Sequence, residues 1–155
     1  MRIREAMTNR VARIRAEASM LEAAEAVSLS GASDLMVVDS TGAFTGVLSE
    51  GDILRAALPD VDEILAAGGS LAGAFERFVT KGRDLSTLPI TPFVIGDALA
   101  VDPDDHVAEA AVVFVERNIR LLPVVRDGRL LGVISRADVC NAVVGGLPRQ
   151  PISVD

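Results

Sequence analysis

An internal duplication limits what this 155-residue chain can fold into more than any other feature of its sequence. Three blocks occur twice, in the same order: residues 22–24 and 109–111 (EAA in both), residues 35–38 (LMVV) and 122–125 (LPVV), and residues 46–53 (GVLSEGDI) and 132–139 (GVISRADV). The spacing is 87 residues for the first two blocks and 86 for the third, because one turn is a residue shorter in the second copy. Ordered matches at a nearly constant period indicate two tandem repeats.

Each copy carries the same succession of apolar patterns. Apolar residues at positions i, i+3, i+4 and i+7 predict a helix in 20–27 and again in 107–114. Pairs of short apolar runs around a turn predict hairpins, at 35–38 with 44–48 and at 121–125 with 130–134. Second helices are predicted at about 51–58 and 137–144, and short strands near 11–14 and 99–101. The pattern predicts an α+β fold of two βαββα repeats, packed as a pseudo-twofold pair because neither copy alone can bury its apolar face.

The predicted division of the chain is repeat 1 at 1–58, a helical insert at 59–93, repeat 2 at 94–146 and a C-terminal tail at 147–155. Asp60 and Glu63 have the spacing of a capping box for a short helix that ends near residue 68. Ser70 is predicted to cap a second helix that ends at residues 81–82, and Pro89 and Pro92 predict an extended return. This second helix carries an apolar stripe, formed by Leu71, Ala74, Phe75, Phe78 and Val79. The stripe fits a helix covering its own core, a dimer contact or a cover over a ligand cleft.

The net charge of −7 at pH 7 argues against a protein that holds nucleic acid by its phosphates. Five arginines nevertheless stand in the first fifteen residues: Arg2, Arg4, Arg10, Arg13 and Arg15. We interpret them as a solvated face flanking a strand, with a basic arm for an acidic partner as the alternative. The apolar runs are shorter than the roughly 18 residues of a membrane span, and the first residues do not form a signal peptide. We therefore expect a soluble, cytoplasmic protein with no membrane and no nucleic-acid partner.

Few residues offer catalytic or metal chemistry. Cys140 is the single cysteine and is predicted to be a small buried residue of a helix, and His106, the single histidine, aligns with Ser19 at a helix start. Asp102, Asp104 and Asp105 form an acidic cluster that lacks the glycine and glutamate of an EF-hand, so we interpret it as a solvated turn. Neither a glycine-rich phosphate loop nor a nucleophile with its base is present. We expect no enzyme and no metal site.

A Ser-x-x-Asp motif opens the second helix of each repeat, as Ser49 with Asp52 and as Ser135 with Asp138. This spacing is that of a capping box, in which the serine oxygen accepts backbone N–H groups and the aspartate lies at the positive end of the helix. The same helix start could bind a ligand instead. Its free N–H groups and the hydroxyl could receive a phosphate, and the carboxylate could accept the two hydroxyls of a ribose. The residues alone leave both functions open.

The duplicated unit, with LPVV before the turn and Gly-h-h-Ser-x-x-Asp after it (h, hydrophobic), resembles a pair of CBS (cystathionine-β-synthase-type) domains, also called a Bateman module. The resemblance covers nearly the whole chain except the insert and the last residues. It implies a regulatory module that binds AMP, ADP, ATP or another adenosyl compound such as S-adenosylmethionine, with no cofactor required. It also implies a homodimer that signals the bound state to an unknown protein partner. The alternative is a ligand-free structural, dimerisation or protein-interaction module.

By the resemblance, the ligand lies in a cleft between the repeats, with the aspartate on the ribose and the serine on the phosphate side. The expected favoured pocket contains Ser135, Arg136, Asp138, Thr8, Ala32 and Ser33. The expected second pocket contains Ser49, Asp52, Ile95, Ala100, Ile119 and Arg120. Arg136 suits a phosphate, whereas Glu50 beside Ser49 would repel one unless Arg120 compensates. The sequence therefore favours the pocket of Asp138.

Overall fold

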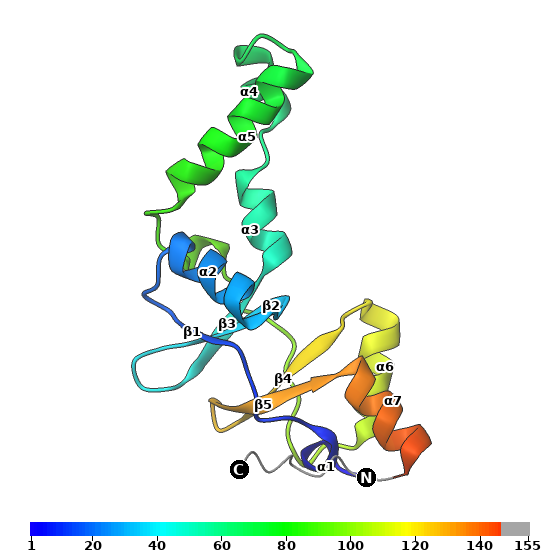
Figure 1. Cartoon of the computed structure of the whole chain (residues 1–155). Coiled ribbons are helices and arrows are strands. Elements are labelled where there is room, and N and C mark those ends of the chain that lie inside the picture. Colours follow the sequence, from blue (N-terminus) through cyan, green and yellow to red (C-terminus); the bar gives the residue numbers. More distant parts are fainter. Residues whose placement is uncertain (147–155) are drawn as a thin grey trace. The chain divides into compact units, whose positions relative to one another are not determined.

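The structure is a computed structural model that describes residues 1–146 and divides into two compact units (Figure 1). The first-repeat unit contains residues 12–40 and 45–96. The second-repeat unit contains residues 1–11, 41–44 and the chain from residue 97. Each unit is built around one copy of the predicted repeat.

The first-repeat unit combines a three-stranded sheet with helices. Its elements are β1 (Arg13–Arg15), α2 (Met20–Ser30), β2 (Asp34–Val38), β3 (Phe44–Ser49), α3 (Glu50–Ala57), α4 (Val61–Ala66), α5 (Leu71–Leu85) and the 3₁₀ turn η1 (Thr91–Phe93). The strand order is β1-β2-β3, and β1 runs parallel to β2 with Ile14 opposite Val37. The core of this unit includes Ile14, Met20, Leu35, Leu48 and Ile90. A capping box forms at the start of α2, because Glu22 N–H donates to Ser19 Oγ and Ser19 N–H donates to Glu22 Oε2.

The second-repeat unit contains a two-stranded sheet and three helices among its described residues. Its elements are α1 (Ile3–Ala6), α6 (Val107–Arg117), β4 (Leu121–Arg126), β5 (Arg129–Ser135) and α7 (Arg136–Gly145). The predicted hairpin of β4 and β5 is antiparallel, and Asp127 and Gly128 close it, both with positive φ, as expected for a two-residue turn. The core includes Val107, Ala110, Phe114, Leu122 and Ile134.

The segment that precedes each repeat in the sequence packs on the core of the other repeat. Ile3 is fully buried against the core of the second repeat, and its N–H donates to the Asp105 carbonyl. Ile90 stands 87 residues later and is fully buried in the core of the first repeat, where its N–H donates to the Ala18 carbonyl. The duplication therefore includes the segments that precede the two repeats.

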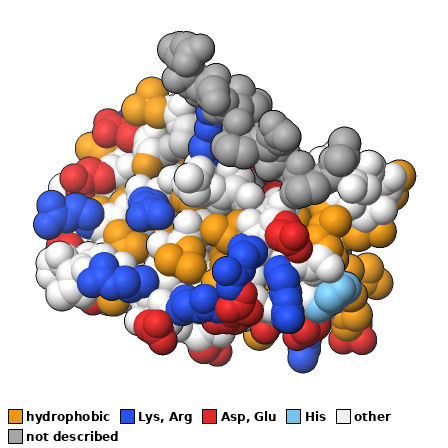
Figure 2. Space-filling model, turned by 90° about the horizontal axis from the view of Figure 1, so that it is seen from below, with side chains coloured by type: hydrophobic (Ala, Val, Ile, Leu, Met, Phe, Trp, Pro, Cys, Tyr) orange, Lys and Arg blue, Asp and Glu red, His pale blue; other side chains and the backbone are white. Residues whose placement is uncertain are grey.

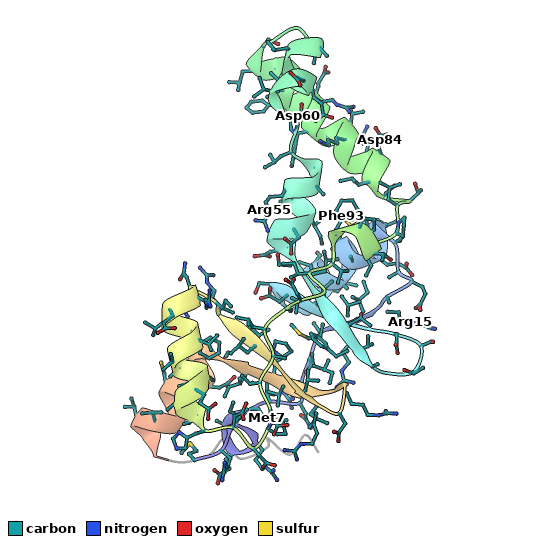
Figure 3. The ribbon with its side chains drawn as sticks, turned by 180° about the vertical axis from the view of Figure 1, so that it is seen from behind. Met7, Arg15, Arg55, Asp60, Asp84 and Phe93 are labelled. Atoms are coloured by element: carbon teal, nitrogen blue, oxygen red, sulfur yellow. The ribbon has the colours of Figure 1, made fainter. Side chains whose placement is uncertain are left out.

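The insert forms a hairpin of α4 and α5, and both predicted caps are present. Asp60 and Glu63 make the capping box of α4, and Ser70 Oγ accepts the N–H of Gly73 at the start of α5. Glu63 joins the two helices, because Arg77 and Lys81 of α5 donate to its carboxylate at 2.9 and 2.7 Å. Figure 3 shows Asp60 at the start of this hairpin and Asp84 in the last turn of α5.

Four details differ from the sequence-based predictions. Helix α5 continues past residue 82 to Leu85, because Leu85 is buried in the core. Pro92 lies in the 3₁₀ turn rather than in an extended segment, since its fixed φ also suits the first turn of a helix. The strand predicted at 99–101 is reduced to one bridge, from Val101 to Val124. Cys140 is exposed rather than buried, because its neighbour Val139 occupies the inner face of α7.

No helix within residues 1–146 has both the length and the apolar character that a membrane span requires. The arginines near the N-terminus are partly neutralised by the acidic cluster. Arg2 donates to the Asp104 carbonyl, and Arg4 forms an ion pair with the Asp104 carboxylate. Basic and acidic side chains accordingly stand side by side on the face shown in Figure 2.

Candidate ligand site

The Ser-x-x-Asp motif of the second repeat forms a closed cap at the start of α7. Ser135 Oγ donates to Asp138 Oδ2 at 2.6 Å, and Ser135 N–H donates to the same oxygen at 3.0 Å. Asp138 N–H donates back to Ser135 Oγ at 3.1 Å. Asp138 is only 4% exposed and is the one buried charged residue among those described. Its carboxylate is thus held in one orientation by its own helix start.

The first repeat builds the same cap at the start of α3. Ser49 Oγ donates to Asp52 Oδ2 at 2.7 Å, and Asp52 N–H donates to Ser49 Oγ at 3.1 Å. Here the second carboxylate oxygen has a basic partner, since Arg55 donates to Oδ1 at 2.5 Å. Burial alone would raise the pKa of Asp52, but the hydrogen bonds from Ser49 and Arg55 outweigh it and lower the pKa. The carboxylate therefore stays ionised at neutral pH.

A glycine three residues before each serine allows another segment to cross the strand. Gly132 lies under Thr8, whose backbone forms two hydrogen bonds of 2.9 Å with Val133. A side chain on Gly132 would overlap the Thr8 carbonyl and would stand 2.9 Å from the Met7 methyl group. This approach explains the glycine of the motif, because only glycine leaves room for the crossing backbone.

The first repeat contains the same crossing. Ile95 exchanges two backbone hydrogen bonds with Val47, and a side chain on Gly46 would overlap the Ile95 carbonyl. Thr8 and Ile95 are 87 residues apart, so they are equivalent positions of the two repeats. Thr8 and Ile95 were expected at the sites only because of the family resemblance, and the role of the two glycines was not predicted. The signal for that role is a glycine inside each predicted strand, which indicates a close approach of another backbone.

A third segment reaches each helix start from the end of the preceding helix. Glu50 N–H donates to the Ser33 carbonyl at 2.9 Å, and Arg136 N–H donates to the Arg120 carbonyl at 3.1 Å. Each unit thus contains the crossing segment, the Ser-x-x-Asp helix start and the segment at 32–33 or 119–120.

The two expected pockets combine residues of both units. The assignment of Ala32 and Ser33 to one pocket, and of Ala100, Ile119 and Arg120 to the other, therefore stays a prediction.

The guanidinium of Arg136 closes the end of α6. It donates from Nε to the Ile119 carbonyl and from Nη2 to the Phe114 carbonyl, both at 2.7 Å, and from Nη2 to Asn118 Oδ1 at 3.1 Å. Carbonyls at a helix C-terminus lack intrahelical partners, so this arginine stabilises the turn in which Asn118 adopts a left-handed conformation. Its Nε and Nη2 donors thus bind groups of its own unit, and the expected role of Arg136 toward a phosphate stays a prediction.

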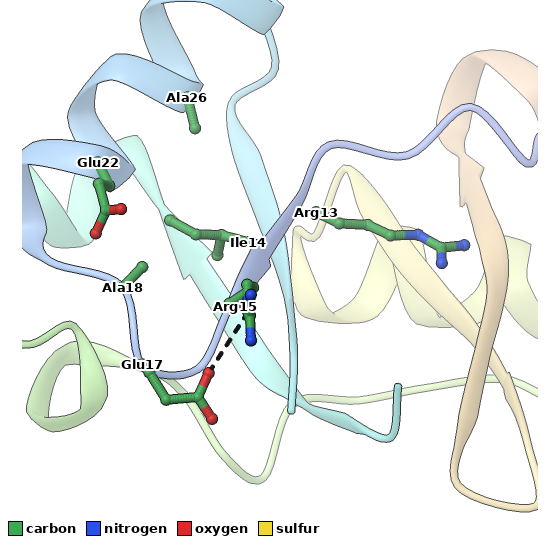
Figure 4. A pocket seen from close by; sticks show the side chains of 7 residues that line it. All are labelled: Arg13, Ile14, Arg15, Glu17, Ala18, Glu22 and Ala26. Carbon is green, nitrogen blue, oxygen red and sulfur yellow. Dashed lines mark ion pairs between the residues drawn. The ribbon is translucent and has the colours of Figure 1, made fainter. Parts of the chain in front are cut away.

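Two surface pockets are lined mostly by residues outside the Ser-x-x-Asp motifs. A pocket of about 420 Å³ in the first-repeat unit is lined by Arg13, Ile14, Arg15, Glu17, Ala18, Glu22 and Ala26, and in it Arg13 extends away from Glu22 (Figure 4). A pocket of about 360 Å³ in the second-repeat unit is lined by Ala111, Phe114, Val115, Asn118, Arg136, Val139 and Cys140. Of the predicted site residues, only Arg136 lines either pocket.

The other polar residues that the sequence singled out have structural partners. Within residues 1–146, no group of three His, Cys, Asp or Glu side chains is arranged to hold a metal ion. Arg126 binds the carboxylates of Asp102 and Asp104, which accounts for the acidic cluster. His106 caps α6, as predicted, because its Nδ1 accepts the N–H of Ala108 at 3.2 Å.

Comparison with known proteins agrees with the duplicated architecture. The signature described as "CBS domain" matches residues 3–59 and 83–145. The uncharacterized protein MJ1426 of Methanocaldococcus jannaschii is 26% identical over 119 residues, which are 70% of this chain and 71% of that protein. Among solved structures, MJ1225 of the same organism, a proposed archaeal homologue of g-AMPK, has a TM-score of 0.74 at 21% identity, over 92% of this chain and 47% of that one. CBSX2 in complex with AMP has a TM-score of 0.68 at 22% identity, over 93% and 96% of the two chains.

Proposed function

Because this chain belongs to the CBS domain family, as a tandem pair of such domains, we propose that it is a regulatory module that binds an adenosine nucleotide. The nucleotide is AMP, ADP or ATP, with S-adenosylmethionine as the other adenosyl compound to test. In this proposal the module catalyses no reaction, acts as a homodimer and passes its bound state to a protein partner.

The observation that carries the proposal is the duplicated helix start. In both units the strand that leads into the serine and aspartate is crossed by a segment at Thr8 or Ile95, over a glycine that keeps the approach open. Helix N-termini favour anions through their free N–H groups and their dipole, and a carboxylate is a strong acceptor for vicinal hydroxyls. A nucleotide presents both groups. The similarity to CBSX2, which was solved with AMP, supports the same ligand class.

In the favoured site, Asp138 holds the ribose hydroxyls and Ser135 faces the phosphate. To accept the ribose, Asp138 must share or exchange the hydrogen bond that Ser135 Oγ now gives it. Arg136 donates to the carbonyls of Phe114 and Ile119 from Nε and Nη2, so its Nη1 is the group that would bind a phosphate while the end of α6 stays closed.

A second function is supported by a different observation. Within residues 1–146, no buried side-chain nitrogen or oxygen lacks a hydrogen-bond partner, and the carboxylates of Asp52 and Asp138 are bonded by their own caps. Such a module is complete without a ligand. It could then serve as a structural, dimerisation or protein-interaction domain.

A thermal-shift panel with AMP, ADP, ATP and S-adenosylmethionine separates the two functions. A ligand that binds only the folded state raises the melting temperature, by an amount that grows with its concentration relative to Kd. The chain has no Tyr or Trp, so adenine retained through purification would dominate absorbance at 260 nm. No shift with any of the four compounds, together with no adenine absorbance, would favour the ligand-free function.

A further inference from the structure

Helix α5 presents two different apolar faces. Phe78 and Leu85 face inward and pack on the core of the first-repeat unit. Leu71, Phe75 and Val79 follow one another at intervals of four residues and are exposed, Phe75 by 63% and Val79 by 50%. The predicted stripe is therefore split: one face covers the core of its own unit, and the other is largely exposed. We call the outer face, with its neighbours Glu76 and Arg83, the α5 outer face.

The α5 outer face is bordered by two opposite charges. Glu76 and Arg83 are exposed and lie seven residues apart, so they project from the same side of the helix, next to Val79. Neither side chain forms an ion pair within the part of the chain that the structure describes. By contrast, Arg77 and Lys81 on another side of α5 are both bound by Glu63.

This arrangement of charges is complementary to itself. The midpoint between Glu76 and Arg83 falls next to Val79. If two α5 helices pair antiparallel about a twofold axis at that point, Glu76 of each copy meets Arg83 of the other. The same axis brings Val79 next to Val79, and it places Phe75, one turn away, beside Arg83 of the other copy. An isologous contact needs a patch that matches itself, and an apolar centre with charged borders is the usual anatomy of an interface.

We propose that the α5 outer face is a self-association surface, and that its occupant is the α5 outer face of a second copy of this chain. The proposal specifies a contact and does not depend on nucleotide binding. The ion network of Glu63 with Arg77 and Lys81 holds α4 against α5, so the surface is supported from behind by a fixed hairpin.

Charge reversal tests the pairing directly. Glu76→Arg alone and Arg83→Glu alone each place like charges at both contacts. Each variant should therefore weaken self-association by roughly ten- to thirtyfold at low salt. An equimolar mixture of the two variants restores opposite charges, so a heterodimer should form. The double variant E76R/R83E should again dimerise with itself. General loss of folding cannot produce this pattern of rescue.

The measurement is molar mass by light scattering across a micromolar concentration series, at 50 and 500 mM salt. The wild-type chain should approach twice its 16.2 kDa mass. Asp84→Arg is the matched control: it makes the same change of charge on the side of α5 away from Phe75, and the dimer should persist. Val115→Asp is the second control, since Val115 is an exposed valine of α6.

Three results would overturn the proposal: a wild-type chain that is monomeric throughout the series, a mixture of the two single variants that does not associate, or a dimer that Val115→Asp dissociates while the α5 variants leave it intact. Val79→Cys in a Cys140→Ser background gives an independent check. A twofold pairing at Val79 predicts a rapid disulfide between two copies under mild oxidation, and its absence in a chain shown to be dimeric would contradict the pairing.

Discussion

The hydroxyl of Ser135 donates a hydrogen bond of 2.6 Å to Oδ2 of Asp138 and accepts one of 3.1 Å from the backbone N–H of the same residue. This reciprocal pair closes the start of α7 and fixes the orientation of a carboxylate that is almost fully buried. It makes the helix start a stable cap, and in the proposed function the same carboxylate accepts the ribose hydroxyls. Substitutions at Asp138 will therefore change both stability and binding, and the two effects have to be measured separately.

The first prediction concerns the crossing segments. Gly132→Ala should lower the free energy of unfolding by about 1–3 kcal/mol, because the added Cβ overlaps the Thr8 carbonyl and the crossing backbone must shift. Gly145→Ala in α7 is the control. Its Cβ would have Asn141 Oδ1 at 3.5 Å as its nearest neighbour, so the change should be neutral or slightly stabilising. Denaturant titration of both variants measures the difference, and equal stability of the two would show that the crossing does not require glycine.

The second prediction concerns the pH dependence of the insert. Hydrogen bonds from Lys81, then from the Asp60 N–H and then from Arg77, lower the pKa of Glu63 from 4.5 to about 2. A group whose pKa is lower in the folded state stabilises the fold above its unfolded pKa and loses that contribution as the pH falls. The wild-type chain should therefore lose stability between pH 4.5 and 2 through this group.

Glu63→Gln should remove that component, so that unfolding curves collected from pH 6 to pH 2.5 show a shallower decline than in the wild type. Glu116→Gln is the matched control, because Glu116 is exposed on α6 and forms no ion pair within residues 1–146. Its pH profile should follow that of the wild type. Identical profiles for Glu63→Gln and the wild type would contradict the role of the network.

The third prediction concerns Arg136. Arg136→Ala removes the donors that hold the carbonyls of Phe114 and Ile119, so amide hydrogen exchange at residues 118–120 should become faster in the protein without nucleotide. Arg120→Ala is the control, because its exposed side chain makes no hydrogen bond or ion pair within residues 1–146. If both variants exchange alike, Arg136 does not hold this turn.

Local signals predicted most of the repeat architecture. Short-range caps such as those of Ser19 and Asp60 depend on residues three apart, so the sequence reveals them directly. The partners of Arg136 lie 17 to 22 residues away, and no local pattern indicates such contacts. The duplication itself, by contrast, was visible from three separate blocks.

Two features could not be read from local signals. The segment around Ile3 is too short to show a period of its own, so only its spacing of 87 residues from Ile90 marks its packing as part of the duplication. The exposure of Cys140 depends on the rotation of α7, in which Val139 and Ala142 take the inner positions. Residue type alone favoured a buried cysteine.

The central claim is that Asp138 binds an adenosine nucleotide. Calorimetric titration of AMP into the wild type, Asp138→Ala and Asp60→Ala tests it most directly, with the melting temperature of each protein measured without ligand. Asp60 is the matched control, because its carboxylate also caps a helix but lies in the insert. Loss of a hydrogen bond to a charged acceptor is worth about 1.5–3 kcal/mol, so Asp138→Ala should weaken AMP binding roughly ten- to a hundredfold.

Asp60→Ala should bind AMP like the wild type, and Asp52→Ala should lose less affinity than Asp138→Ala, because Glu50 disfavours phosphate in the second site. Saturable binding by the wild type that falls by at least tenfold in Asp138→Ala alone is the result we predict. A wild-type chain that binds no AMP, or an Asp138→Ala variant that is less stable yet binds AMP unchanged, would contradict the claim.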